Sequence, residues 1–246
     1  MPLSKDFTAI FIKEIEVNFL NCYPNGFLKY TDLCNILQLT AASHSELGNL
    51  SYSDMQLHNQ AWVLSRMRVE ITELPKWKDI ITVKTWIVDM QGSRSVRALE
   101  IYKNDIKIVG ALTHWVVLNT KLRKAENLVL PHGHFITYPD NISTLKSFEK
   151  RDLNQELKTV SNRTIVLSDL DIVNHANNVK YLEWCLDSLN YKEILRQKIK
   201  SFDMNFLREL HFNDNITIES SLEEIPNSYF VKKQGKNCFA LKLEYK

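Results

Sequence analysis

Apolar and polar residues follow the same succession of patterns twice along this chain. In the first succession, residues 7–20 alternate as in a strand, and residues 30–43 keep their apolar side chains at helical spacing. Four runs rich in Val, Ile, Thr and Trp then follow at 62–72, 79–90, 93–102 and 106–118. The first half therefore predicts one strand, one helix and an antiparallel meander.

The second succession begins after residue 156. Residues 157–167 are strand-like, and Val179, Leu182, Leu186 and Leu189 fall at helical spacing. Short strands are expected at 201–212, 216–224, 228–233 and 239–245. A helix wrapped by a curved antiparallel sheet is a self-contained unit, and two such units can join their sheets edge to edge. The predicted fold class is α+β, with two helix-wrapped-by-antiparallel-sheet repeats.

The periodicity is lost between the two halves, where Pro131, Gly133 and Pro139 are found among many polar residues. We expect an N-terminal repeat at 1–125, a linker at 126–156 and a C-terminal repeat at 157–246. An offset of 151 residues places Lys29-Tyr30 on Lys180-Tyr181 and Cys34 on Cys185. Three matches support a repeat less strongly than the repeated order of elements does.

Composition excludes several classes of protein. The 246 residues are 44% hydrophobic, but no stretch approaches the roughly 20 consecutive apolar residues of a membrane span. With 31 Lys and Arg against 29 Asp and Glu, the net charge of +2 gives no global case for binding nucleic acid. The six glycines form neither of the two common glycine-rich phosphate loops. A Rossmann or P-loop nucleotide enzyme is therefore disfavoured.

The four cysteines are widely spaced and include no C-x-x-C pair: Cys22, Cys34, Cys185 and Cys238. Charged residues interrupt the apolar positions of the first twenty residues, which is not the pattern of a signal peptide. We therefore expect four free, mostly buried thiols and a cytoplasmic location.

Polar residues are concentrated at the start of the second predicted helix, in residues 168–178. Two acids, one histidine and three asparagines lie there: Asp169, Asp171, His175, Asn174, Asn177 and Asn178. A helix N-terminus presents unpaired N–H groups that can hold an oxyanion, which suits acyl transfer or hydrolysis. The alternative is an Asn or Asp N-cap beside a histidine whose hydrogen bonds are satisfied. With the offset of 151, Leu20 and Pro24 occupy the matching positions of the first half, so one site per chain is expected.

This segment resembles the D-L-D-x-N-x-H-x-N-N-x-K-Y segment of the acyl-(acyl carrier protein) thioesterases, the plant-type fatty acyl thioesterases and their bacterial relatives. The resemblance covers nearly the whole chain, with supporting matches in the same order at Trp62-Val-Leu-Ser-Arg66, Pro75-Lys-Trp77-Lys-Asp79, Thr85-Trp86, Trp115, Arg123 and Pro131. It implies a double hotdog fold. It also makes the N-terminal repeat the substrate-pocket half and the C-terminal repeat the catalytic half.

The resemblance assigns catalytic roles by position to Asp171, His175 and Glu209. The family's Asn between the first two falls on Val173, and the nearest amide is Asn174, which becomes a fourth catalytic candidate. Plant members have a Cys where this chain has Leu210, so a Cys–His nucleophile is disfavoured. The expected substrate-binding residues are Asn177, Asn178, Trp62 and Trp86.

Thioester hydrolysis needs a nucleophile, a donor to the carbonyl oxygen and a proton for the departing thiolate. Either a carboxylate activates water or Asp171 attacks covalently, and both routes stay open at this point. The implied function is hydrolysis of fatty acyl-acyl carrier protein to free fatty acid and holo-carrier protein, without cofactor or metal. The alternatives are an acyl-CoA thioesterase and a non-catalytic acyl-binding hotdog protein.

The implied partner is an acyl carrier protein with a phosphopantetheine-linked acyl chain, and no nucleic acid or membrane span is expected. Two basic clusters could meet an acidic carrier, although each can equally be a solvated face: Lys121, Arg123 and Lys124, and Lys192, Arg196, Lys198 and Lys200. His132-Gly-His134 lacks further metal ligands nearby, so no metal site is predicted there. Because a double hotdog contains its own pairing, monomer and homodimer are both left open.

Overall fold

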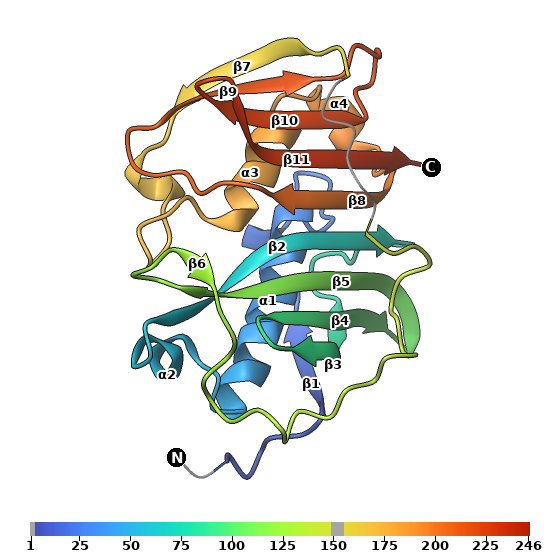
Figure 1. Ribbon diagram of the computed structural model, residues 1–246. Coiled ribbons are helices and arrows are strands. Elements are labelled where there is room, and N and C mark those ends of the chain that lie inside the picture. The colour runs from blue at the N-terminus through green and yellow to red at the C-terminus, as the bar shows by residue number, and fades with distance from the viewer. Residues whose placement is uncertain (1–2, 149–154) are drawn as a thin grey trace. The chain divides into compact units, whose positions relative to one another are not determined.

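A computed structural model describes residues 3–148 and 155–246 of the chain (Figure 1). The chain divides into two compact units, Met1–Ser147 and Phe148–Lys246. Each unit contains an antiparallel sheet and one principal helix. The predicted α+β class with two repeats of helix and sheet is therefore confirmed.

From residue 3 onward, the first unit carries six strands: β1 (Ile10–Glu16), β2 (Gln60–Ile71), β3 (Ile80–Gln91), β4 (Arg94–Lys103), β5 (Ile106–Asn119) and β6 (Lys124–Ala125). The order across the sheet is β1-β3-β4-β5-β2, with β6 paired to β5. Asn104 and Asp105 both have positive φ between β4 and β5, as a tight two-residue hairpin requires. The helical elements are η1 (Phe19–Asn21), α1 (Tyr30–Leu47) and α2 (Tyr52–Gln56).

Helix α1 provides much of the core of the first unit. Five residues at helical spacing along it are buried, together with Tyr30, Cys34 and His44: Leu33, Ile36, Leu37, Thr40 and Ala41. The helix packs against β3 (Figure 1). An apolar stripe on one helix face thus covers one face of the sheet, as expected for this class of fold.

The segment expected to be a linker, 126–156, instead packs on the first unit as far as residue 147. Leu128 and Phe135 are buried in a cluster with residues of α2, β3 and β5. A Cβ added to Gly110 of β5 would collide with the carbonyl of Ser143. The backbone of β5 and the backbone at Ser143 therefore approach closely, which only glycine allows. Loss of periodicity marked the end of regular structure but not the end of the unit. Part of the expected linker, 149–154, lies outside the described residues.

Among its described residues, the second unit carries five strands: β7 (Lys158–Thr164), β8 (Ile199–Phe206), β9 (Asn215–Ser220), β10 (Ser228–Lys233) and β11 (Lys236–Tyr245). Their order is β8-β11-β10-β9-β7. The helical elements are η2 (Leu167–Asp169), α3 (Asn178–Leu186) and α4 (Tyr191–Leu195). Helix α3 packs against β10 and β11 (Figure 1).

The observed boundaries differ from the predicted ones at a few places. Strand β8 ends at Phe206 rather than near residue 212, so Glu209 lies in the irregular segment that follows. Short helices α2 and α4 are too brief to show periodicity, and both begin at side-chain caps, Ser51 and Asn190. None of the helices that the structure describes combines the length and apolar character needed to cross a membrane.

Candidate active site

Residues 170–176 contain two of the predicted catalytic residues and are here called the catalytic turn; they form a tight loop immediately before α3. Leu170 pairs with Ala176 as an isolated antiparallel bridge. Inside it, the N–H of Asp171 donates to the carbonyl of His175 at 2.9 Å, and the N–H of Asn174 donates to the carbonyl of Asp171 at 3.0 Å. These bonds bring the backbone of Asp171 next to that of His175, so two of the predicted residues are adjacent.

The carboxylate of Asp171 is held by the backbone of its own turn. Its Oδ1 accepts the N–H of Val173 at 3.0 Å and the N–H of His175 at 3.2 Å. No hydrogen bond to Oδ2 is found within residues 3–148 and 155–246. Two backbone donors therefore fix the orientation of the carboxylate and leave one oxygen for a further partner.

A single backbone bond brings the catalytic turn to the segment after β8. The N–H of Ala176 donates to the carbonyl of Leu210 at 2.8 Å. On one side of this bond, His175 Nε2 lies 3.6 Å from Glu209 Oε2, and the two side chains are 23% and 25% exposed. Asp171 and His175 in the turn and Glu209 beside it are thus gathered in one place that solvent can reach.

Asn174 has a backbone role in this turn. It is exposed and has φ of +63°, in the left-handed region that Asn adopts more readily than most residues. The donor that Val173 lacks in its side chain is supplied by its own backbone N–H, which binds Asp171. The geometry therefore explains Asn174 without a role as a donor to the carboxylate.

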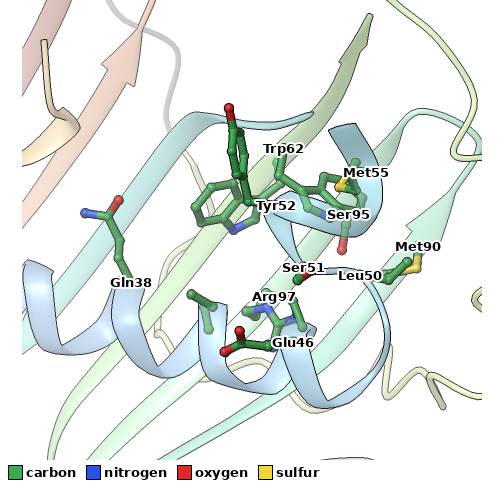
Figure 2. A pocket seen from close by; sticks show the side chains of 14 residues that line it. Gln38, Glu46, Leu50, Ser51, Tyr52, Met55, Trp62, Met90, Ser95 and Arg97 are labelled. Carbon is green, nitrogen blue, oxygen red and sulfur yellow. The ribbon is translucent and has the colours of Figure 1, made fainter. Parts of the chain in front are cut away.

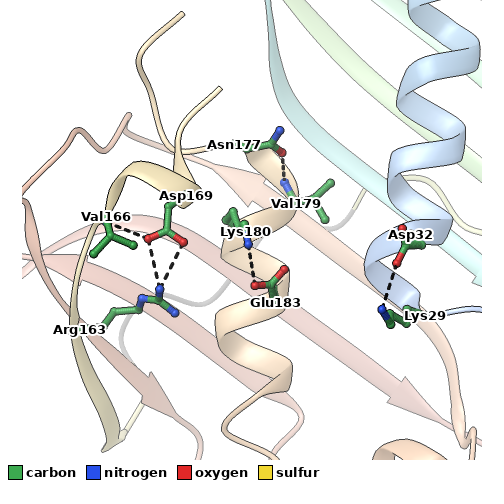
Figure 3. A network of polar contacts seen from close by, with 9 residues as sticks. All are labelled: Lys29, Asp32, Arg163, Val166, Asp169, Asn177, Val179, Lys180 and Glu183. Atoms are coloured by element: carbon green, nitrogen blue, oxygen red, sulfur yellow. Dashed lines mark hydrogen bonds and ion pairs between the residues drawn. The ribbon is translucent and has the colours of Figure 1, made fainter. Parts of the chain in front are cut away.

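Asn177 is the N-cap of α3, where its Oδ1 accepts the N–H of Val179 at 2.9 Å (Figure 3). Asn178 is the first residue of the helix. Asp169 is only 2% exposed and binds Arg163 at 3.2 Å (Figure 3). Asn177 and Asp169 thus hold the helix start and the turn before it in place, which is the cap interpretation for Asn177.

The cysteines do not provide a nucleophile near this site. All four are free, and Cys34, Cys185 and Cys238 are buried, as predicted. Burial raises the pKa of the Cys185 thiol well above its usual range, which disfavours the reactive thiolate. Leu210, at the position of the plant-type Cys, is fully buried.

A cavity of about 290 Å³ lies in the first unit (Figure 2). Apolar and polar side chains of α1, α2, the segment between them and four strands line it: Gln38, Ala41, Ala42, Ser45, Glu46, Leu50, Ser51, Tyr52, Met55, Trp62, Met90, Ser95, Arg97 and Trp115. Trp62, which the sequence predicts to bind substrate, lines this cavity. Trp86 does not, because it is buried and its Nε1–H donates to the carbonyl of Asn141 at 2.9 Å.

One wall of this cavity contains a buried cation, Arg97. Its guanidinium donates to His44 Nδ1 at 2.8 Å, to Thr85 Oγ1 at 3.2 Å and to Ser45 Oγ at 3.1 Å. Burial lowers the pKa of Arg97 to about 9, and burial together with the nearby Arg97 charge lowers the pKa of His44 to about 3. His44 is therefore neutral, with its proton on Nε2, which faces the carbonyl of Thr8 at 2.9 Å.

Sequence analysis did not predict two features near the candidate site and the cavity, His211 and Arg97. His211 packs its ring edge-on against His175, with centroids 4.9 Å apart. Its position two residues after Glu209 was the available signal, because alternate residues of the strand predicted at 201–212 would share a face. Arg97 carried no such signal, since its strand reads as ordinary and only the folded unit places it at the cavity.

Comparison with known proteins identifies the family of both units. Residues 8–130 match the family model described as the acyl-ACP thioesterase N-terminal domain, and residues 152–246 match that of the C-terminal domain. The palmitoyl-acyl carrier protein thioesterase of Arabidopsis thaliana is 30% identical over 190 residues, which is 71% of this chain and 46% of the relative. An oleoyl-acyl carrier protein thioesterase of the same plant is 26% identical over 227 residues, or 83% and 60% of the two chains. The chain thus spans about half of the length of these relatives.

Solved structures agree on the fold. An acyl-ACP thioesterase from Bacteroides thetaiotaomicron has a TM-score of 0.86 at 24% identity, covering 97% of this chain and 98% of that chain. The 12:0-ACP thioesterase from Umbellularia californica has a TM-score of 0.79 at 18% identity, again covering 97% and 98%. The fold is a double hotdog, and the two family models together match most of the chain. The chain belongs to the acyl-ACP thioesterase family.

Proposed function

We propose that this protein hydrolyses fatty acyl-acyl carrier protein to free fatty acid and holo-carrier protein. The observation that carries the proposal is the convergence of Asp171, His175 and Glu209 beside one backbone bond in a chain of this family. The first unit, with the cavity, is the substrate-pocket half. The second unit, with the catalytic turn, is the catalytic half.

The proposed chemistry uses the side chains of the second unit. The water oxygen attacks the thioester carbonyl carbon, the C–S bond breaks, and the thiolate leaves with a proton that returns from the enzyme. Glu209, whose Oε2 faces His175 Nε2, is placed to take the proton of water, and His175 orients this carboxylate. Asp171 uses Oδ1 for the turn and keeps Oδ2 for the reacting groups, either as a second base or as a covalent nucleophile.

The acyl chain is proposed to lie in the cavity of the first unit. Leu50, Met55, Trp62, Met90 and Trp115 give it an apolar wall, and burial of each methylene contributes about 0.8 kcal/mol. We place Trp62 in substrate binding. Trp86 supports the segment around Asn141 instead.

The carrier protein is proposed to bind through basic side chains. All residues of the two basic clusters are exposed, including Lys124 in β6 and Lys192 on α4. Long-range attraction by such residues accelerates association with an acidic partner and weakens with salt. A cytoplasmic location and the choice between monomer and homodimer stay as predictions.

The deciding experiment compares one acyl chain on two carriers. Thiol release is measured with the same acyl group on acyl carrier protein and on coenzyme A, with and without a chelator. We expect a higher kcat/KM with the carrier protein and no loss of rate on chelation. A higher kcat/KM on coenzyme A identifies an acyl-CoA thioesterase. Binding without hydrolysis of either identifies a non-catalytic acyl-binding protein.

A further inference from the structure

Three potential metal ligands meet next to the catalytic turn. One nitrogen each of His175 and His211 and one oxygen of Glu209 lie within 4.8 Å of one another. Two imidazoles and one carboxylate form a donor set that suits zinc and related divalent transition metals. Tetrahedral ligands at ordinary zinc bond lengths are separated by about 3.3 Å, so the cluster needs to contract by about 1.5 Å at most.

The cluster can contract because its parts differ in freedom. The Ala176 N–H to Leu210 carbonyl bond, at 2.8 Å, fixes the two backbone segments that carry the ligands. His211 is the most exposed of the three side chains, at 51%, against 23% for His175 and 25% for Glu209. A rotation of the exposed His211 ring can therefore close the set around an ion without moving the backbone.

A second carboxylate, that of Asp214, lies next to both the backbone N–H and the ring of His211. Asp214 Oδ2 accepts the backbone N–H of His211 at 2.9 Å and lies 3.9 Å from its Nδ1. Lys233 binds the other oxygen of Asp214 at 2.6 Å and so holds this carboxylate in place. A carboxylate next to one ring nitrogen is common among metal-ligating histidines and favours metal binding through the other nitrogen.

We propose that His175, Glu209 and His211 bind one zinc-class divalent cation, and that this ion inhibits the enzyme reversibly. Inhibition follows because two of the proposed catalytic side chains, His175 and Glu209, coordinate the ion and are then unavailable for hydrolysis. The inhibitory part rests on the proposed function, whereas the binding part rests on the ligand geometry alone. Three protein ligands leave the remaining coordination positions to solvent, so a chelator can remove the ion.

The experiment separates binding from inhibition. Chelator-treated protein is titrated with CoCl₂, followed by the visible absorption of the bound ion, and with ZnCl₂ by calorimetry. We expect one ion per chain, and affinity at least tenfold weaker in His211→Gln. His58→Gln, at an exposed histidine outside the cluster, serves as the matched control and keeps wild-type affinity.

Thioester hydrolysis is then measured at the same zinc concentrations. Wild-type activity should fall in proportion to the occupied fraction and recover with chelator, while His211→Gln keeps its own activity at zinc concentrations that inhibit the wild type. Unchanged metal affinity in His211→Gln, or equal loss in His58→Gln, overturns the site. Activation by zinc overturns the inhibitory role. Protein that binds cobalt through His211 but hydrolyses no thioester instead refutes the proposed function.

Discussion

The turn at residues 22–28, here called the mirror turn, has the same backbone hydrogen bonds as the catalytic turn. The N–H of Tyr23 donates to the carbonyl of Phe27 at 2.8 Å, as that of Asp171 does to His175 at 2.9 Å. Adding 148 to a residue number of the mirror turn gives its counterpart. The two units therefore build the same loop before their principal helix.

Each turn also binds a neighbouring segment of its own unit in the same way. Leu28 donates its N–H to the carbonyl of Pro75, and Ala176 donates to the carbonyl of Leu210, both at 2.8 Å. The side chains at the equivalent positions differ in chemistry. They are Tyr23, Phe27 and Leu74 in the first unit and Asp171, His175 and Glu209 in the second.

The difference shows that the backbone hydrogen bonds of the turn do not by themselves form a candidate catalytic site. The side chains at these positions are also required. Lys76 lies over the ring of Phe27 at 4.7 Å, in the place where His211 packs against His175. One pair is a cation on an aromatic ring, and the other is two imidazoles beside a carboxylate. The proposed hydrolysis is thus assigned to the second unit by its side chains alone, and the cavity lies in the first unit.

The largest expected effect is on catalysis in the second unit. Glu209→Gln should lower kcat roughly 10²-fold or more, because it removes a charge next to His175 while keeping the shape of the side chain. Glu224→Gln, at an exposed glutamate, should leave kcat unchanged. Steady-state thiol release and thermal unfolding of both variants test this. Wild-type kcat in folded Glu209→Gln would remove Glu209 from the mechanism.

The next effect concerns the buried histidine of the first unit. Folding lowers the pKa of His44 to about 3, whereas its pKa in the unfolded chain is about 6.5. Between these values the unfolded chain binds one more proton, so the free energy of unfolding falls with falling pH, by about 1.4 kcal/mol per pH unit. Stability from neutral His44 is therefore present above pH about 6.5 and is lost below it.

Denaturant unfolding between pH 6.5 and pH 4.5 measures this loss, which should total about 2 kcal/mol. In His44→Gln the same pH interval should show a smaller slope, whatever the stability of the variant at neutral pH. An equal slope in both proteins would assign the acid sensitivity to other groups.

Smaller effects are expected at the left-handed position shared by the two turns. Gly26 has φ of +79° and Asn174 has φ of +63°. Replacement of either by Ala should cost about 1 kcal/mol of unfolding free energy, since Ala is strained there. Asn174→Gly should be nearly neutral.

Kinetics on the Asn174 variants distinguish this backbone role from a role as donor. Normal kcat is expected in both Asn174→Ala and Asn174→Gly. A tenfold loss of kcat in folded Asn174→Gly would show that the amide takes part in catalysis, as the sequence had suggested.

The smallest effect is expected at Cys185. It is fully buried in α3 and its raised pKa keeps it protonated, so Cys185→Ala should retain wild-type kcat. An inactive variant with a normal circular dichroism spectrum would restore a thiol mechanism.

The repeated order of elements was predictable from the sequence because long strands and one helix per unit have clear periodicity. The offset between the repeats was not. Matching Tyr30 with Tyr181 gives 151, but Tyr30 is the first residue of α1 and Tyr181 is the fourth of α3. The equivalent backbone hydrogen bonds of the two turns give an offset of 148 residues. These bonds do not depend on residue identity. The conclusion that the first unit lacks the polar residues is unchanged.

The site was predictable in part. Asp171 and His175 are close in sequence, so their motif located them together, and the resemblance added Glu209. Contacts between segments distant in the sequence had no such signal, including the bond from Arg97 to His44 and the packing of Trp86 against the segment at Asn141. These depend on which segments the fold brings together.

The most direct test of the central claim compares Asp171→Asn with Tyr23→Phe, its counterpart in the mirror turn. Asn keeps an oxygen at Oδ1 for the N–H groups of Val173 and His175, so the turn should persist and thermal unfolding should be nearly unchanged. Hydrolysis of acyl-acyl carrier protein should fall roughly 10²-fold or more in Asp171→Asn and stay at the wild-type level in Tyr23→Phe. Wild-type kcat in folded Asp171→Asn would contradict the assignment of catalysis to the second unit's turn.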